Sequence, residues 1–281
     1  MVLRLGLIGH PIQHSFSPWI HQHFLKQIAV KGSYRLKNIA PDCFNEQTVS
    51  SAKAELQDGF NVTVPYKRAI MPYLDQLDER AARVGAVNTV VHQNGKWIGY
   101  NTDGIGYIKG LQEAYPAQTR DMSIRILVIG AGGAARAIYD ALIVQQYEYI
   151  DIANRTLEAA EQLATELASS GITTRVMSLE AAEKELSRYD LIIQTTTMGM
   201  KPGPEHSVIA LERMKQAAIA SDIVYQPIHT AFLKEAGERG GNIHYGHHML
   251  LYQAQYAFKL WTGHWVKLGS LPDRMKRQLE R

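Results

Sequence analysis

One lysine and one aspartate stand in polar segments whose residue types suit proton-transfer chemistry. Lys67 ends the segment Asn-Val-Thr-Val-Pro-Tyr-Lys, and Asp103 lies within Asn-Thr-Asp-Gly. Reduction of a ketone by hydride transfer needs a proton for the new alkoxide, and a lysine amine can supply that proton and remove it in the reverse direction. A nearby carboxylate would orient the amine. Lys67 and Asp103 are therefore the candidate catalytic pair, although Asn-Thr-Asp-Gly by itself could be only a turn.

Hydroxyl and amide side chains occur near the ends of the predicted strands in the same half of the chain. Ser15 and Ser17 lie in the first loop, Thr63 lies near the end of the predicted strand 60–64, and Asn88 follows the segment 84–87. Together with the amine and the carboxylate, these groups suit a small, hydroxylated and anionic ligand. Each has a simpler alternative, since Ser17 before Pro18 is also typical of a helix N-cap with proline at the first helical position.

A glycine-rich loop, Gly130-Ala131-Gly132-Gly133-Ala134, follows a predicted strand and opens a predicted helix. This is the context that a dinucleotide-binding fingerprint requires. Gly130 permits a tight turn, Gly132 lets the backbone approach a pyrophosphate, and the small Ala135 keeps the helix close to the strand. The N–H groups and the dipole of the helix would then bind the negative charge. A tight strand-to-helix turn without a ligand remains the alternative for this loop alone.

The segment Asn154-Arg155-Thr156, at the end of the next predicted strand, bears on the choice of cofactor. NAD enzymes usually carry Asp or Glu there to bind the ribose 2′-OH. Arg155 can instead pair with a 2′-phosphate through a forked, charge-assisted contact, which favours NADP. The alternative is that Arg155 is a surface residue near a helix start. Asp151, earlier in the strand, is interpreted as structural.

The predicted elements bring these groups to strand ends. In the first hundred residues we expect strands at 3–8 and 60–64, a helix after Ser17, and a hairpin of 87–91 with 97–98 around Asn94-Gly95. A second series begins near residue 104, with helices between strands at 125–129, 150–152, 173–177, 190–194 and 219–225. This alternation predicts an α/β fold with a doubly wound parallel sheet.

Composition excludes several other classes of protein. The 281 residues carry a net charge of +3 with 46% hydrophobic residues, and the short basic cluster near the C-terminus is interpreted as a solvated helix face rather than a nucleic-acid site. No apolar run approaches the ~18–20 residues that span a bilayer. The single cysteine, Cys43, cannot form an intrachain disulfide, so we expect a cytoplasmic protein. No metal is expected, because neither His21-x-His23 nor His247-His248 matches a common zinc spacing.

These segments, in this order, resemble the shikimate dehydrogenase family over nearly the whole chain. The glycine loop is shared by many dehydrogenases, but its combination with the serine, lysine and Asn-Thr-Asp segments is highly specific. The matching segments are 9–18, 61–67, 85–89, 101–104, 130–134, 154–156, 195–200, 225–227 and 249–253.

The resemblance implies a reversible, NADPH-dependent reduction of 3-dehydroshikimate to shikimate in chorismate and aromatic amino-acid biosynthesis. Lys67 would be the proton donor and acceptor, with Asp103 as its partner. The residues implied to bind substrate are Ser15, Ser17, Thr63, Lys67, Asn88, Asp103, Tyr225 and Gln253. Those implied to bind NADP(H) are Glu79, Gly130, Ala131, Gly132, Gly133, Ala134, Asn154, Arg155, Thr156, Thr195, Ile223, Gly246 and Met249.

The resemblance also implies the domain organisation. Residues 1–103 would form the substrate-binding catalytic domain and 104–245 a Rossmann-type NADP-binding domain. Residues 246–281 would form C-terminal helices that return to the first domain. A homodimer is one alternative for the oligomeric state, and no nucleic-acid or membrane partner is expected.

Three departures from the family pattern leave alternatives open. Ala159 stands where many members carry Lys or Arg, which removes one cation from the 2′-phosphate side and softens the expected preference for NADP. His248 replaces a frequent glycine and could crowd or polarise the nicotinamide side. The segment 230–233 reads Thr-Ala-Phe-Leu rather than Thr-Pro-Leu-Leu. The alternatives are a quinate/shikimate dehydrogenase of broader substrate or NAD specificity and, more remotely, a non-catalytic regulator that senses NADP or a metabolite.

Overall fold

The structure is a computed structural model that describes residues 2–200 and 203–280. The chain divides into two compact units, each described here by itself. The first contains the chain up to Thr102 together with Gln253–Lys267, and the second contains Asp103–Tyr252 together with the chain from Leu268. The long helix α9 (Gly246–Thr262) contributes to both units.

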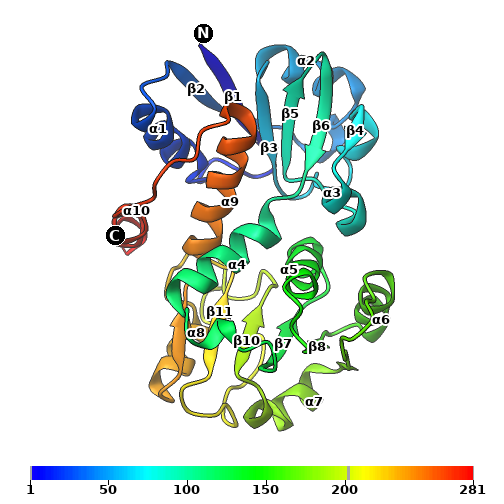
Figure 1. The fold of residues 1–281 in the computed structure, drawn as a ribbon, viewed down its shortest axis with the longest axis vertical. Helices are drawn as coiled ribbons and strands as arrows, with labels where there is room; N and C mark the ends of the chain where they lie inside the picture. Colours follow the sequence, from blue (N-terminus) through cyan, green and yellow to red (C-terminus); the bar gives the residue numbers. More distant parts are fainter. Residues whose placement is uncertain (1, 201–202, 281) are drawn as a thin grey trace. The chain divides into compact units, whose positions relative to one another are not determined.

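The first unit is built on a mixed sheet, shown in Figure 1. In the described part of the chain its strands are β1 (Leu3–Gly9), β2 (Gly32–Asn38), β3 (Gly59–Val62), β4 (Gln76–Leu77), β5 (Thr89–Gln93) and β6 (Lys96–Tyr100). They lie in the order β2-β1-β3-β5-β6-β4, with β1 parallel to β2 and β3, and β5 antiparallel to both of its neighbours. The predicted hairpin is confirmed. Asn94 and Gly95 both have positive φ, as a type I′ turn requires.

The helices of the first unit are α1 (Ser17–Gln27), α2 (Glu46–Glu55), α3 (Glu79–Val84) and the end of α9. The predicted N-cap role of Ser17 is wrong. Phe16 occupies the cap position without a side-chain bond, and Ser17 is the first helical residue. The end of α9 is held to the sheet by Trp261, whose indole Nε1 donates to the Val90 carbonyl at 2.9 Å.

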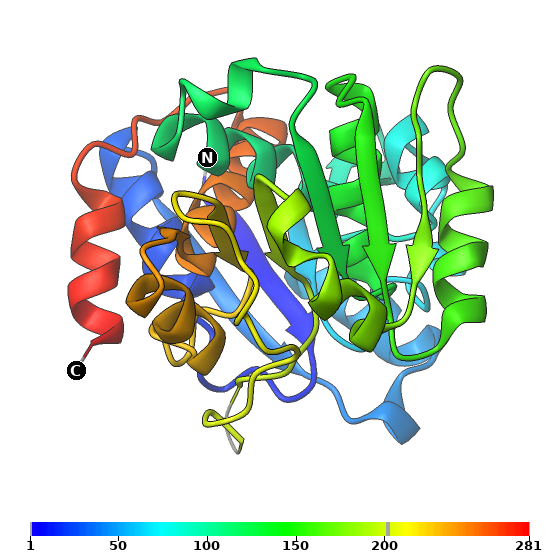
Figure 2. The ribbon, with the colours of Figure 1, turned by 90° about the horizontal axis from the view of Figure 1, so that it is seen from below.

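The second unit contains an all-parallel sheet, whose strands point the same way in Figure 2. Its described strands are β7 (Arg125–Ile129), β8 (Tyr149–Ala153), β9 (Val176–Met177), β10 (Leu191–Gln194), β11 (Ile219–Asp222) and β12 (Asn242–His244). Their spatial order is β12-β11-β10-β7-β8-β9. Numbered along the chain, this is the 3-2-1-4-5-6 order of a dinucleotide-binding fold. The predicted doubly wound sheet is confirmed.

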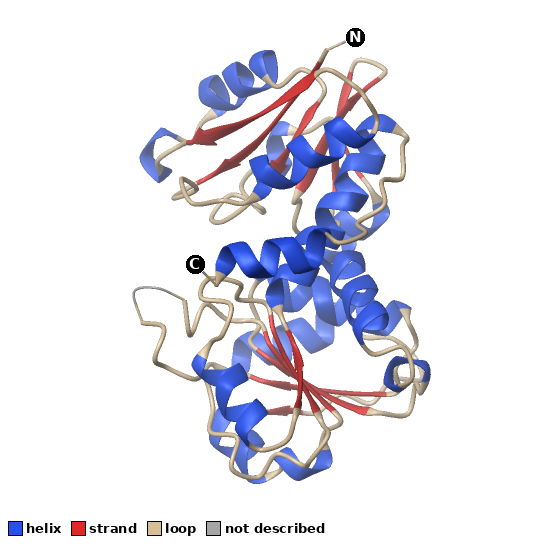
Figure 3. Cartoon of the chain, turned by 90° about the vertical axis from the view of Figure 1, so that its left-hand side faces the viewer, coloured by secondary structure: helices blue, strands red, loops and turns tan. Residues whose placement is uncertain are grey.

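Helices cover both faces of this sheet, as Figure 3 shows. They are α4 (Asp103–Ala114), α5 (Gly133–Val144), α6 (Leu157–Glu166), α7 (Leu179–Lys184), α8 (Ala231–Glu238) and the start of α9. The helix α10 (Leu271–Leu279) also belongs to the second unit. Alternate residues of β7 enter separate cores because side chains alternate along a strand. Ile126 and Val128 pack with Ile138 of α5, whereas Leu127 and Ile129 pack with Phe232 of α8.

Two strands are shorter in the structure than the ranges predicted from the sequence. At 173–177 only Val176–Met177 forms a strand, with an isolated bridge from Thr173 to Tyr149. The run 219–225 ends as a strand at Asp222, because the Asp222 carboxylate bends back to accept the Val224 N–H at 2.8 Å. Short 3₁₀ turns lie at Pro41–Cys43, Met71–Tyr73, Gln118–Arg120 and Leu186–Arg188.

Candidate functional site

The two predicted serines of the first unit lie directly after β1 and share hydrogen bonds. The Ser15 hydroxyl lies 3.2 Å from the Ser17 hydroxyl and also accepts the Ser17 backbone N–H at 3.2 Å. Ser17 is buried, and it hydrogen-bonds the phenol of Tyr34, a β2 residue. The serine pair is therefore attached to the sheet through Tyr34.

A network of buried polar side chains continues from Tyr34 across the sheet. The Tyr34 phenol donates to Asn61 Oδ1 at 2.7 Å, and Asn61 Nδ2 donates to the Thr89 hydroxyl at 3.0 Å. Thr89 in turn donates to Asn88 Oδ1 at 3.0 Å. Burial raises the pKa of the Tyr34 phenol, so this hydroxyl stays protonated and remains a donor. Because buried polar groups are costly unless paired, the network holds its members in defined orientations.

Asn88 is the junction at which the network reaches two other segments. Its Oδ1 accepts the Thr102 N–H at 2.8 Å, and its Nδ2 donates to the Thr102 hydroxyl at 3.0 Å. The same Nδ2 lies 3.3 Å from Oε1 of Gln253 on α9. The structure thus brings together Ser15, Ser17, Asn88 and Gln253, which the sequence spreads over most of the chain.

Lys67 and Thr63 lie in the turn that follows β3, and both are half-buried. The Thr63 carbonyl accepts the Tyr66 N–H at 2.9 Å, and the Lys67 carbonyl accepts the Val87 N–H at 2.8 Å. These bonds fix the backbone of the lysine beside the strand that leads to the polar network. Asp103, the predicted partner, is buried at the start of α4 in the second unit, so its pairing with Lys67 stays a prediction. Glu79 is exposed in the first turn of α3.

The glycine loop of the second unit has the form that the sequence predicts. Gly130 has φ 113°, which favours glycine, and a Cβ there would lie 2.6 Å from the Thr195 hydroxyl. Gly132 is the N-cap of α5 and Gly133 its first residue. Among the described residues no side chain caps this helix. A Cβ on either Gly132 or Gly133 would meet no described atom within 4 Å. The helix N-terminus therefore presents backbone N–H groups beside open space, as a pyrophosphate site requires.

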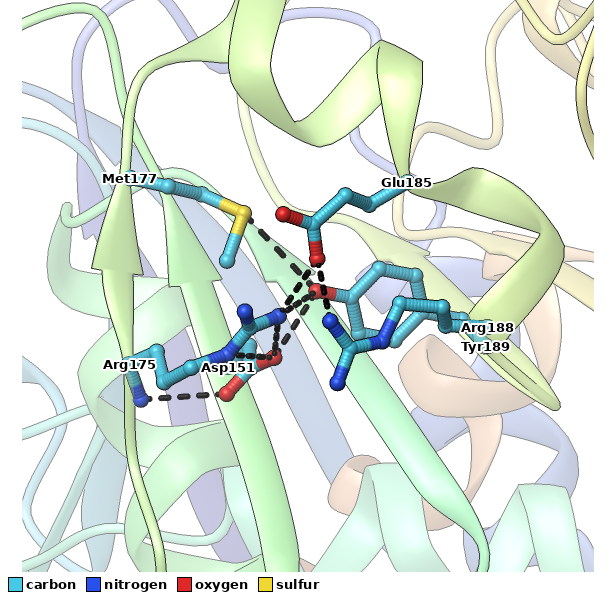
Figure 4. Close-up of polar contacts among 6 residues, drawn as sticks. All are labelled: Asp151, Arg175, Met177, Glu185, Arg188 and Tyr189. Atoms are coloured by element: carbon cyan, nitrogen blue, oxygen red, sulfur yellow. Dashed lines mark hydrogen bonds and ion pairs between the residues drawn. The ribbon is translucent and has the colours of Figure 1, made fainter.

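The segment after β8 separates a structural carboxylate from exposed candidates for phosphate contact. Asp151 accepts two bonds from the Arg175 guanidinium at 3.1 and 2.8 Å and one from the Tyr189 hydroxyl at 2.8 Å, as Figure 4 shows. The interpretation of Asp151 as structural is confirmed. Arg155 and Thr156 are exposed, and the Asn154 amide donates to the Thr156 carbonyl at 2.8 Å.

The remaining predicted cofactor residues follow β10 and β11 or lie at the start of α9. Thr195 is buried and its hydroxyl donates to the Ile129 carbonyl at 2.7 Å. A Cβ on Gly246 would lie 2.4 Å from the Ile223 carbonyl oxygen, so only glycine lets α9 begin this close to the segment after β11. Met249 packs into the core beneath, and Tyr225 is a half-buried residue whose pKa is raised by burial.

His248 is half-buried and lies beside the buried imidazoles of His244 and His247 in the second unit. Its ring centroid lies 4.3 Å from that of His247 and 5.2 Å from that of His244. Burial lowers the pKa of His248 to about 4 and that of His247 to about 3. Both rings are therefore uncharged at neutral pH.

Comparison with known proteins agrees with this geometry. Residues 7–90 match the model of the shikimate dehydrogenase substrate-binding domain, and residues 116–227 match the model described as shikimate/quinate 5-dehydrogenase. A curated shikimate dehydrogenase (NADP⁺) from Oceanobacillus iheyensis is 48% identical over 280 residues, covering 100% of this chain and 99% of the relative. The chain belongs to the shikimate dehydrogenase family.

Solved structures of the shikimate dehydrogenase family have the same fold. A crystal structure of a shikimate dehydrogenase in complex with NADP⁺ superposes with a TM-score of 0.90 at 37% identity, covering 100% of this chain and 96% of the other. Quinate dehydrogenase from Corynebacterium glutamicum in complex with NAD superposes with a TM-score of 0.87 at 28% identity, with 98% of each chain covered. The predicted family and fold class are thus confirmed.

Some buried polar residues of this shikimate dehydrogenase family member were missed as site candidates. They are Tyr34, Thr89, Thr102, Gln194 and Asp222. Thr89, Thr102, Gln194 and Asp222 are polar residues at or just beyond the end of a strand, a signal that also describes many turn residues. Tyr34 lies within β2 and has no such signal. Within residues 2–200 and 203–280, no group of three His, Cys, Asp or Glu side chains could hold a metal ion, and no helix is long and apolar enough to span a membrane.

Proposed function

We propose that this protein catalyses the reversible reduction of 3-dehydroshikimate to shikimate with NADPH as the hydride source. The observation that carries this proposal is 48% identity, along the full length of both chains, to a curated NADP⁺-dependent shikimate dehydrogenase. We assign substrate binding to the first unit and NADP(H) binding to the second. The geometry of each unit supports its part of this assignment.

The polar network of the first unit suits a carboxylate that carries several ring hydroxyls. Ser15 and Ser17 offer hydroxyls to the carboxylate, and Thr63, Asn88 and Gln253 offer hydroxyl and amide groups to the ring hydroxyls. We add Tyr225 of the second unit to the same set. Because buried neighbours already orient Ser17 and Asn88, the binding groups are positioned before the ligand arrives, which lowers the entropy cost of binding.

In the proposed mechanism Lys67 moves the proton and Asp103 assists it. Bound NADP(H) would supply the hydride for the ketone carbon and would take it up again in the reverse direction. The protonated Nζ of Lys67 gives a proton to the ketone oxygen as the alkoxide forms, and in the reverse direction the neutral amine removes the proton from that hydroxyl. Asp103 accepts a hydrogen bond from the amine or from the same hydroxyl. This bond keeps the amine and the substrate hydroxyl oriented for proton transfer.

The second unit supports NADP(H) as the cofactor. The N-terminus of α5 suits the pyrophosphate, with Ala131 and Ala134 completing the loop around the glycines. Arg155 is exposed in the position where NAD enzymes usually carry a carboxylate, and its guanidinium can pair with the 2′-phosphate. Asn154 and Thr156 flank it. We assign Thr195, Ile223, Gly246 and Met249 to the ribose and nicotinamide side, and Glu79 to a peripheral contact.

A quinate/shikimate dehydrogenase that accepts NAD is the second candidate function. Ala159, in the first turns of α6, is exposed and provides no second cation for the 2′-phosphate. The test is the rate of reduced-cofactor formation at alkaline pH with shikimate or quinate and with NADP⁺ or NAD⁺. We expect rapid turnover only with shikimate and NADP⁺. Turnover with quinate or NAD⁺ would favour the second candidate, and no turnover with any pair would refute both.

Tyr34→Phe should weaken shikimate binding although we assign Tyr34 no contact with the substrate. The change leaves Asn61 Oδ1 and the Ser17 hydroxyl without their phenol partner, so we expect the free energy of unfolding to fall by ~1–3 kcal/mol. The hydroxyls of Ser15 and Ser17 should then be less well oriented, and this should raise the KM for shikimate by about fivefold, the equivalent of ~1 kcal/mol. Thermal melts and steady-state kinetics measure these effects.

Tyr66→Phe is the matched control for this prediction. The Tyr66 hydroxyl is also in the first unit and donates to the Ile39 carbonyl at 2.5 Å, outside the polar network. Its loss should lower stability without changing the KM for shikimate. Equal effects of the two variants on that KM would contradict a specific role for Tyr34.

A further inference from the structure

Asp222 is a buried carboxylate at the end of β11 to which the proposed mechanism gives no role. Asp222 is only 1% exposed. Its Oδ1 accepts the Val224 N–H at 2.8 Å and the Gln194 amide at 3.2 Å, and its Oδ2 accepts the Thr230 hydroxyl at 2.7 Å. One carboxylate thus joins the end of β10, the segment after β11 and the start of α8, where Thr230 is the N-cap.

Gln194 extends this arrangement into the segment 195–198, which follows β10. Gln194 and Asp222 are direct neighbours in the pairing of β10 with β11. The Gln194 Nε2 donates both to Asp222 and to the Met198 carbonyl at 3.0 Å, and its Oε1 accepts the Thr196 N–H. Asp222 Oδ1 already accepts the Val224 N–H, so it acts as an acceptor and Gln194 presents Nε2 to it. This leaves Gln194 Oε1 directed at the Thr196 N–H.

The segments joined in this way carry the residues assigned to the nicotinamide side. Thr195 is adjacent to Gln194, Ile223 is adjacent to Asp222, and the Ile223 N–H donates to the Gln194 carbonyl at 3.1 Å. Burial raises the pKa of Asp222 to about 7, since the donors only partly offset the loss of hydration. Open α/β sheets bind their ligands at the carboxyl ends of the strands, and Asp222 lies at that end of β11. Buried carboxyls with a raised pKa are also frequent at functional sites.

We propose that Asp222 is a positioning residue for the cofactor, acting through Gln194 and Thr230 to hold the loops after β10 and β11 in their NADP-binding conformation. This inference rests on the proposed function, since it gives those loops a ligand. Asp222 touches neither substrate nor cofactor in this account. Its removal should therefore weaken cofactor binding more than it slows the chemical step.

The test compares substitutions at the end of β11 with one at the opposite end of the neighbouring strand β10. Asp222→Ala removes every acceptor, whereas Asp222→Asn keeps one oxygen for the Val224 N–H and the Gln194 amide. Asp190→Ala is the matched control. Asp190 lies just before β10, at the opposite end of this strand, where it accepts the Arg125 N–H at 2.9 Å and pairs with Lys215. Each variant is titrated with NADP⁺ by calorimetry, assayed for KM and kcat with shikimate, and melted thermally.

We expect Asp222→Ala to raise the dissociation constant and KM for NADP⁺ by about tenfold, with kcat and the KM for shikimate changed less than about threefold. Asp222→Asn should recover most of the affinity. Asp190→Ala should lower the melting temperature without changing NADP⁺ affinity. If Asp222→Ala does not fold, Gln194→Met, which removes the amide while keeping the side-chain length, should give the same weaker NADP⁺ binding.

Unchanged NADP⁺ affinity in Asp222→Ala, or in Gln194→Met where that variant is needed, would overturn the proposal. An equal loss in Asp190→Ala would also overturn it, because the effect would then come from general loosening of the sheet. The proposed function fails differently. Wild-type protein that binds NADP⁺ without oxidising shikimate would refute the reaction while the calorimetric comparison still decides the role of Asp222.

Discussion

Lys67→Ala should lower kcat for shikimate oxidation by about 10²–10⁴-fold, the range typical of losing a positioned general acid–base group. The proposed reaction transfers one proton to or from the substrate oxygen, and the Lys67 amine is the group assigned to it. Because the hydride transfer itself would be unimpaired, a small residual rate with water as the proton carrier is expected. Stopped-flow and steady-state measurements of NADPH formation give the rate.

Arg68→Ala is the control for this prediction, because Arg68 is the next residue, carries the same charge and is exposed. We expect it to change kcat by less than about twofold, since an exposed cation has little effect at a distance in water. Calorimetry with shikimate and NADP⁺ should show that Lys67→Ala still binds both ligands. An unchanged kcat in Lys67→Ala would refute the proposed mechanism.

Arg155→Ala is expected to raise the KM for NADP⁺ by ~10- to 100-fold and to leave the KM for NAD⁺ nearly unchanged. The guanidinium is assigned to the 2′-phosphate, which NAD⁺ lacks, and hydrogen bonds to charged groups contribute ~1.5–3 kcal/mol. Since Ala159 provides no second cation, we expect no neighbouring charge at that position to offset the loss of the Arg155 guanidinium. Steady-state kinetics with both cofactors at fixed ionic strength measure the effect.

Two further variants bracket the Arg155 prediction. Ala159→Arg adds a cation in the first turn of α6, close in the chain to Arg155, and should lower the KM for NADP⁺ by giving the 2′-phosphate a second charged partner. Lys184→Ala removes an exposed cation from α7 of the same unit and should change neither cofactor's KM. If Arg155→Ala raised the KM for NADP⁺ and for NAD⁺ equally, Arg155 would not bind the 2′-phosphate.

Local geometry was the part of the molecule most open to prediction from sequence. Asn94-Gly95 predicts the hairpin because its turn needs positive φ at both positions, and the structure has it there. Gly130 and Gly132 likewise predict a strand-to-helix turn with an accessible backbone. By contrast, the N-cap prediction for Ser17 failed because the helix begins one residue earlier, with Phe16 at the cap position and Ser17 as the first helical residue. The Ser17 hydroxyl bonds Tyr34 of β2, a partner that the local sequence does not indicate.

The sequence by itself determined the fold class, the cofactor loop and the family, because these depend on periodicity, glycine positions and motif order within short segments. Only the tertiary structure decided which polar groups share a network. Asn88 and Gln253 are 165 residues apart and meet through α9, and Asp222 meets Gln194 because β10 and β11 are neighbours. The physical reason is that a buried polar side chain must find a partner wherever the packed chain supplies one, and sequence separation does not limit that choice.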